Sequence, residues 1–312
     1  MLLTPPVLHL LGRQHGIASD AQLGEHLTTR QIRRALAHGL LHGELPGVRR
    51  LAGTVEDVQS RVMALSLYSA PDGFISGMAA ARQHGVECVP REYLELMVHE
   101  RRAPHLPKWV TCTRSSWRLE ADRRELSGGR AVASPLRTLF RCGATCSEVR
   151  FEKIAEQMWN RKLITPSEAA DYLELVRRQG RYGVGRFEKW LEKASTRERP
   201  SQSASEVELA LAAVAAGLPE PVRQHQLTLL NGEPIHVDVA WPVVRLGLEP
   251  GATFWHSGDE KVRSDHGRDR ACDEIGWRIV RFDEVELRDL DSCVRQVVNI
   301  YRQRMRSLVV AS

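Results

Sequence analysis

The hydrophobic positions of residues 1–53 recur at helical spacing. One run, which follows a pair of threonines, places Ile32, Leu36 and Leu40 on a single face, and shorter runs cover "ASDAQLGEHL" and positions 5–15. Two short apolar stretches then flank a Pro-Gly pair in "LLHGELPGVRRLAG", which is typical of a β-hairpin. Three helices followed by a hairpin is the element order of a winged helix-turn-helix domain, which we expect over residues 1–53.

Residues 54–198 mix both periodicities and predict a mixed α/β and helical middle domain. "TVEDVQSRVMALSLYS" and "GFISGMAAARQHGVE" read as helices, "YLELMVHE" and "KWVTCTRS" read as strands, and helices dominate from residue 134 onward. The polar, proline-broken stretch "STRERPSQSAS" at 195–205 is expected to be a linker. A third domain is therefore expected over residues 199–312.

The third segment predicts a compact α/β unit. "SEVELALAAVAAG" is a helix in which Ser205 and Glu208 have capping-box spacing. Two strands flank the Asn-Gly pair at 231–232, the strongest short hairpin signal. "VVRLGLEP" is a further strand, "RDRACDEIG" a helix, and "WRIVRFDEVEL" a final strand and turn. The fold class that follows is an α+β multidomain protein.

Charge narrows the choice of partner. Lys and Arg together number 44 against 39 Asp and Glu, a formal net charge of +5, and most of the cations are arginines. Arginine suits bidentate contact with phosphate, so DNA is the favoured partner, and the alternative is a merely soluble basic protein. The last helix of the N-terminal domain would read the major groove with its outer face. The candidate DNA-contacting residues of this helix are Thr29, Arg30, Gln31, Arg33 and Arg34. Two arginines of the hairpin, Arg49 and Arg50, are further candidates. The alternative is an ordinary solvated basic helix.

The cysteine pattern bears on zinc binding, and the length of the apolar stretches bears on the cellular compartment. The six cysteines are scattered and form no zinc-ligand pattern. No stretch approaches the ~20 apolar residues of a membrane span, and "MLLTPPVLHLLGRQHG" lacks the features of a signal peptide. We therefore expect a cytoplasmic protein with no membrane partner.

Candidate chemistry gathers in the third segment. Asp238 lies in "IHVDVAW", where alternation places it opposite Val237 and Val239, and Glu249 ends the next strand. Adjacent antiparallel strands would bring the two carboxylates together, as a hard divalent cation such as Mg²⁺ or Mn²⁺ requires. Glu208, or with less support Glu206, would add a third carboxylate from the preceding helix. The alternative for Glu208 is a capping role alone.

The stretch "GATFWH" supplies further candidates. His256 is suited to proton transfer, and Asp265 would orient it or hold a second ion. Phe254 and Trp255 offer apolar faces that stack on or wedge between bases. Each has a plain alternative, with the aromatic residues in the core and the histidine satisfied near a helix start.

Together these residues resemble a known family. Asp238, "GATFWH" and "RSDHGRDRACDEIGWRIVRF" are similar to the very-short-patch-repair type of endonuclease, a branch of the PD-(D/E)XK nuclease fold, over roughly 203–290. The resemblance implies that Asp238 is the main metal ligand, that His256 transfers the proton and that Trp255 with Phe254 faces DNA. It implies auxiliary roles for Glu208 and Asp265, and relatives tend to carry glutamine at the position of Gln224.

Upstream, "IRRALAHGLLHGELPGVRRLAG" and "FISGMAAARQHGV" resemble the winged-helix antitoxin domain of the AbiE type, and "ASPLRTLFRCG" resembles the segment that follows it. One departure matters in the C-terminal part. Relatives place an acid where this chain has Gly251 after Glu249 and Pro250, and broader nucleases place lysine there. Three functions therefore stay open. They are a Mg²⁺-dependent DNA endonuclease in repair or foreign-DNA defence, an inactive DNA-binding regulator or antitoxin with a protein partner such as a toxin, and a pure protein-interaction module.

Overall fold

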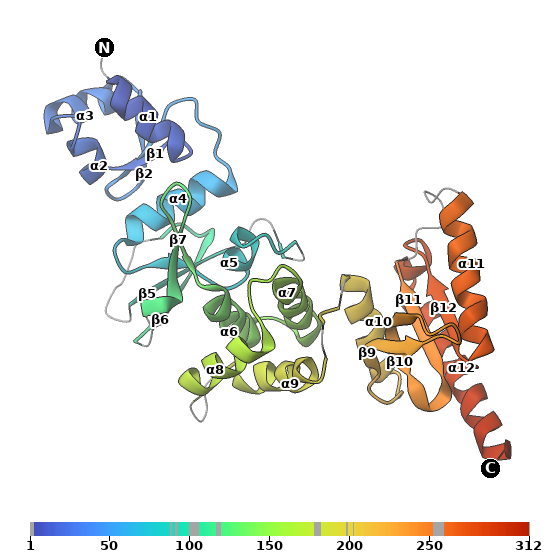
Figure 1. Cartoon of the computed structure of the whole chain (residues 1–312). Coiled ribbons are helices and arrows are strands. Elements are labelled where there is room, and N and C mark those ends of the chain that lie inside the picture. The colour runs from blue at the N-terminus through green and yellow to red at the C-terminus, as the bar shows by residue number, and fades with distance from the viewer. Residues whose placement is uncertain are drawn as a thin grey trace. The chain divides into compact units, whose positions relative to one another are not determined.

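A computed structural model describes residues 3–87, 89–90, 93–99, 106–116, 120–177, 182–197, 199–201, 203–251 and 259–311. For residues 120, 259–266 and 309–311 it describes the backbone alone. The described chain is a mixed α/β protein whose strands form three sheets (Figure 1). It divides into two compact units, residues 1–146 with 175–187 and residues 147–174 with 188–312.

The first unit begins with three short helices and a three-stranded antiparallel sheet of order β1-β3-β2. Their bounds are α1 Pro5–Arg13, β1 Ile17–Ser19, α2 Asp20–Gly24, α3 Thr29–Ala37, β2 Leu41–Leu45 and β3 Val48–Leu51. The predicted helices and hairpin are present, and β1 is an additional strand that the sequence did not predict. Capping boxes start both α2, at Ser19 and Gln22, and α3, at Thr28 and Gln31.

The rest of the first unit surrounds a mixed five-stranded sheet of order β6-β5-β4-β8-β7. The bounds are α4 Val58–Ser69, β4 Phe74–Ile75, α5 Gly77–Gln83, β5 Leu94–His99, β6 Val110–Ser115, β7 Arg123–Leu126, β8 Arg130–Ala133 and α6 Pro135–Thr145. Its core includes Phe74 and Leu96, both almost fully buried, and Val62 of α4. The helix expected over "GFISGMAAARQHGVE" starts only at Gly77, because Phe74 and Ile75 pair into the sheet.

The second unit contains α7 Glu148–Asn160 and most of α8 Pro166–Val176 and α9 Val184–Ser195. It continues with α10 Ala204–Ala215, β9 Val222–Thr228, β10 Pro234–Trp241, β11 Leu246–Pro250, α11 Asp259–Glu274, β12 Arg278–Phe282 and α12 Leu290–Ala311. The order of α10 to β12 is the one that the sequence predicts, and the long helix α12 is an addition to it.

Strands β9–β12 form one mixed sheet of order β12-β11-β10-β9, with helices packed through two hydrophobic clusters. Leu209 of α10 and Val297 of α12 pack with Leu248 of β11 in one cluster. Cys272 of α11 packs with Val237 of β10 in the other. The sheet therefore packs against helices in two separate hydrophobic clusters.

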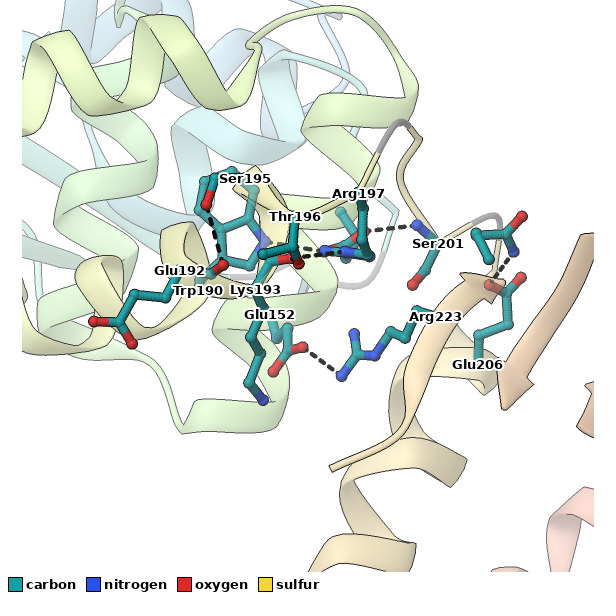
Figure 2. Close-up of polar contacts among 12 residues, drawn as sticks. Glu152, Trp190, Glu192, Lys193, Ser195, Thr196, Arg197, Ser201, Glu206 and Arg223 are labelled. Carbon is teal, nitrogen blue, oxygen red and sulfur yellow. Dashed lines mark hydrogen bonds and ion pairs between the residues drawn. The ribbon is translucent and has the colours of Figure 1, made fainter. Parts of the chain in front are cut away.

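Residues 195–205 do not behave as the free linker that their composition predicts. Within the second unit, the buried Glu156 of α7 accepts hydrogen bonds from Ser201 N at 2.7 Å and from Arg197 Nη2 at 2.6 Å (Figure 2). Trp190 Nε1 donates a third at 3.0 Å. A buried carboxylate that is paired and hydrogen-bonded holds its partners firmly, so this segment is fastened to α7.

Among the described helices, none combines the length and the apolar composition needed to cross a lipid bilayer.

Candidate functional site

The pairing of β10 with β11 brings the two predicted acids to the same point of the sheet. The antiparallel register runs through Trp241↔Leu246, Ala240↔Gly247 and Val239↔Leu248. Asp238 precedes Val239 and Glu249 follows Leu248, so the two acids flank the last pair of this register. The charge of Glu249 raises the pKa of Asp238, as expected for two acids close together. The two acids are therefore neighbours at this end of the β10–β11 pairing, and their role in binding a cation stays a prediction.

The strand around Asp238 is irregular. Val237 packs in the α11 cluster and Val239 in the α10–α12 cluster, so the two do not share one face as simple alternation predicts. On the adjacent strand β9, Gln224 has a φ of 52°, in the left-handed region that non-glycine residues rarely adopt. A local distortion of a strand re-aims the side chains beside it, and such distortions are common next to functional sites.

Gln224 links two carboxylates. Its Nε2 atom donates to Asp238 Oδ1 at 2.9 Å and to Glu206 Oε2 at 3.0 Å. Its Oε1 atom is buried and has no hydrogen-bond partner among the described residues. An unsatisfied buried acceptor next to two acids indicates that a donor or a cation belongs at this place. We call Glu206, Asp238 and Glu249 the carboxylate cluster.

Glu206, rather than Glu208, is the acid of α10 that faces Asp238. The expectation that Ser205 and Glu208 form the capping box is wrong, because the helix is capped two residues earlier by Ser203 and Glu206. Glu206 is 2% exposed, and its carboxylate also accepts from Ser203 N at 2.9 Å. Glu208 pairs with Lys153 of α7 instead. The helix thus presents its capping glutamate to the cluster.

The protonation of Asp238 reflects these surroundings. Burial, together with the negative charges of Glu206 and Glu249, raises its pKa to about 7, against the opposing effects of the Gln224 hydrogen bond and of Arg268. Keeping all the carboxylates of one site ionised costs free energy, because their negative charges repel one another. A cation placed among them would relieve the repulsion, and such perturbed groups mark candidate functional sites.

Glu249 is already paired. Arg268 Nη2 of α11 lies 3.1 Å from its Oε1, and Arg281 Nη2 of β12 lies 3.0 Å from its Oε2. Arg281 sits beside Glu249 in the parallel β11–β12 register and also pairs with Asp269 at 3.0 Å. The sequence analysis did not identify either arginine. Their positions in the helix and the final strand of "RDRACDEIGWRIVRF" carried no signal of this pairing.

The donor set suits a hard cation but is incomplete within the described residues. Carboxylate and amide oxygens are the ligands that Mg²⁺ and Mn²⁺ take. However, no group of three or more His, Cys, Asp or Glu side chains comes together as a metal site in the part of the chain that the structure describes. Gly251 follows the cluster with a φ of 88°, a backbone conformation that favours glycine over a residue with a charged side chain.

Several predicted residues lie outside this description. Phe254, Trp255 and His256 are not among the described residues, and Asp265 falls in α11 where only the backbone is described. Their assigned roles stay predictions.

The predicted DNA-reading side chains of α3 are exposed. Thr29, Arg30, Gln31, Arg33 and Arg34 all lie on the solvent side of the helix, while Ile32 is buried beneath them. Gln31 also caps the helix, since its Oε1 accepts from Thr28 N at 2.8 Å.

The two hairpin arginines are engaged within the first unit. Arg49 makes a bidentate pair with Asp20, with donor–acceptor distances of 2.6 and 2.7 Å, and this pairing raises its pKa. Arg50 pairs with Glu44 at 2.9 Å. Both guanidinium groups therefore stabilise the sheet, and contact with DNA would require them to exchange partners.

No protein-family model matches the chain. It is similar to two proteins of Mycobacterium tuberculosis, MT2308 of strain CDC 1551 / Oshkosh and Rv2248 of strain ATCC 25618 / H37Rv, both described as uncharacterized. Each is 29% identical over 192 residues, which cover 61% of this chain and 62% of the relative. The chain thus spans less than two thirds of the length of these curated relatives.

Proposed function

We propose that this chain is a DNA-binding protein whose second unit hydrolyses DNA phosphodiesters with a divalent cation. The observation that carries the proposal is the buried carboxylate cluster: Asp238, with a pKa of about 7, lies between Glu206 and Glu249 and is held by Gln224. The order of elements from α10 to β12 supports it, because Asp238 lies on β10 and Glu249 on β11, and helix α11 precedes the last strand β12, in line with the resemblance to PD-(D/E)XK nucleases.

The N-terminal helices support the DNA-binding half of the proposal. Helix α3 follows α2 closely, packs Ile32 and Ala35 into the core and presents arginines on its outer face. The β2–β3 hairpin that follows stands where a winged helix carries its wing. Phosphate contacts from such arginines supply affinity, and base contacts from the same helix supply specificity.

In this proposal, each side chain at the carboxylate cluster has a distinct role. Asp238 and Glu249 would hold Mg²⁺ or Mn²⁺, which supplies Lewis-acid stabilisation of the charge that develops on the phosphate. Gln224 fixes the orientation of Asp238 through its hydrogen bond. Glu206 increases the negative potential at Asp238 and so favours a cation there. Arg268, which is partly exposed beside Glu249, is placed to contact a phosphate oxygen. Proton transfer by His256 is carried over from the resemblance.

A cleavage assay tests this function. Purified protein is incubated with supercoiled, mismatched and single-stranded DNA in the presence of Mg²⁺ or Mn²⁺, alongside Asp238→Asn. The proposal expects cleavage by the wild type and a loss of at least about a hundredfold in the variant, since removal of one essential electrostatic group costs this much. Equal cleavage by the two proteins would remove Asp238 from the mechanism.

The pairing of Glu249 with Arg268 and Arg281 favours a second candidate function. Two guanidinium groups on one carboxylate satisfy it without a metal, as in a catalytically silent DNA-binding regulator or antitoxin whose second unit recruits DNA or a protein partner. The same assay separates the two functions. Sequence-specific duplex binding without cleavage of any of the three substrates identifies the regulator.

A further inference from the structure

A cleft of about 430 Å³ opens within the second unit next to the carboxylate cluster. It is lined by the end of α9, by strand β9 and by His236 of β10. Four of its lining residues are permanently cationic, namely Lys193, Arg197, Arg199 and Arg223, and Glu220 is the acid that lines it. Arg223 pairs with Glu152 (Figure 2), and Arg197 pairs with Glu156. Both acids are buried in α7, and neither lines the cleft.

Arg223 has hydrogen-bonding capacity that the unit does not use. Its side chain is 3% exposed. Its Nη2 atom lies 2.5 Å from Glu152 Oε1, whereas its buried Nη1 atom has no hydrogen-bond partner among the described residues. A guanidinium offers donors and no acceptor, so the missing partner must present oxygen acceptors. Buried donors without acceptors are costly and rare, which indicates a ligand at this wall.

Arg199 adds a cation at the mouth of the cleft. It is exposed and has no ion-pair partner in the described part of the chain. Lys193, by contrast, pairs with Glu220 at 2.8 Å. The cleft therefore combines neutralised cations along its wall with one unneutralised arginine, an arrangement suited to an elongated anion rather than to a single small ion.

Gln224 connects the wall of the cleft to the carboxylate cluster. It lines the cleft and also donates to Asp238 at 2.9 Å. On the neighbouring strand, His236 lines it, and its carbonyl oxygen accepts from Arg268 Nη2 at 2.6 Å. Asp238 and Arg268 thus each lie one hydrogen bond beyond a residue of the cleft wall.

We infer that this cleft binds the phosphate backbone of a single nucleic-acid strand and guides it to Asp238. Phosphate oxygens are acceptors only, they recur along the strand, and arginine binds them bidentately. The volume suits a segment of one strand rather than a duplex. His225 lines the cleft and stacks on the buried Trp277, with ring centroids 5.4 Å apart, so its ring is held at the wall, where an aromatic ring can contact a base. This inference rests on the proposed function, because it places the strand for that reaction.

Fluorescence anisotropy with a short labelled single-stranded oligonucleotide tests it, in EDTA so that no cleavage occurs. The full chain is compared with Arg199→Ala, Arg199→Glu and the control Arg302→Ala, which removes an exposed arginine of α12 outside the cleft. Arg199→Ala should weaken binding roughly three- to tenfold and reduce the salt slope by about 0.7, as expected for one lost contact to a single strand. Arg199→Glu should weaken it further, and Arg302→Ala should change neither quantity.

The outcomes separate this inference from the proposed reaction. Oligonucleotide binding that depends on Arg199 supports the cleft even if no substrate is cleaved with Mg²⁺, in which case hydrolysis fails and the binding site stands. Wild-type cleavage with unchanged affinity and KM in Arg199→Glu would overturn the cleft and leave hydrolysis intact. Tighter Arg199-dependent binding of an acidic peptide of equal charge would also overturn it.

Discussion

Gln224 Nε2 donates a hydrogen bond to Asp238 Oδ1 over 2.9 Å, from a residue whose backbone is held in the left-handed region. A non-glycine residue with this backbone persists only where its surroundings fix it. The pair therefore fixes the orientation of the acid on which the proposed chemistry depends. It also connects that acid to Glu206, which accepts from the same nitrogen at 3.0 Å.

The raised pKa of Asp238 predicts a pH-dependent stability. Its pKa is about 7 in the folded chain against an ordinary value of 3.8 for an aspartate in the unfolded chain, so the folded state binds more protons than the unfolded state between these values. Stability should therefore fall as pH rises from about 4 to about 7, by roughly 2–4 kcal/mol. Urea unfolding in EDTA across this range should show the fall in the wild type and a smaller one in Asp238→Asn. An equal slope in both proteins would contradict the assignment.

Two glutamates of α10 make a matched pair for testing the composition of the cluster. Glu206→Gln should abolish cation-dependent cleavage, because it removes a buried charge next to Asp238. Glu208→Gln should leave cleavage unchanged and cost at most about 1 kcal/mol, since it loses only a partly exposed pair with Lys153. Cleavage rates and unfolding curves of both variants check this. The reverse pattern would restore Glu208 to the site.

The same two residues show where prediction from sequence fails. The segment "SASEVE" contains two overlapping Ser-x-x-Glu patterns, and local spacing does not choose between Ser203–Glu206 and Ser205–Glu208. The choice depends on which face of the helix is buried. Leu209, Ala210 and Ala213 pack into the core, and this orientation turns Glu206 toward Gln224.

For other features, too, a specific physical reason explains whether they could be predicted from the sequence. The Asn-Gly hairpin and the spacing of Asp238 and Glu249 set a register that short-range rules capture. The pairing of Arg268 and Arg281 with Glu249 joins segments on a helix and two strands, and no periodicity encodes it. The polar composition of residues 195–205 predicted a linker, because composition alone does not show that a backbone amide of this segment donates a hydrogen bond to Glu156 of α7.

Glu156 should be among the residues most important for the stability of the second unit. Glu156→Ala leaves the buried Arg197 guanidinium without its partner and Ser201 N without its acceptor, at an expected cost of about 3–5 kcal/mol. The control Glu148→Ala removes an exposed pair with Lys189 and should cost under about 1 kcal/mol. Denaturant unfolding measures both. Similar costs for the two variants would mean that the fastening of residues 197–201 is energetically minor.

The arginines of the N-terminal unit should separate into two groups. Arg33→Ala and Arg34→Ala remove exposed cations of α3, so each should weaken duplex DNA binding and lower the salt slope by about 0.9 without changing stability. Arg49→Ala breaks the bidentate pair with Asp20 and should lower thermal stability more than DNA affinity. Gel-shift titrations at several salt concentrations, with melting curves, check the division. Unchanged binding in Arg33→Ala and Arg34→Ala would move the contact surface away from α3.

The most direct test of the account is isothermal titration of the full chain with Mn²⁺ and with Mg²⁺ at about pH 8, where Asp238 is ionised. The central claim predicts saturable cation binding by the wild type that is lost in Asp238→Asn and in Glu206→Gln and retained in Glu208→Gln. Absence of binding in the wild type, or equal binding in all four proteins, would contradict a cation site built on these carboxylates.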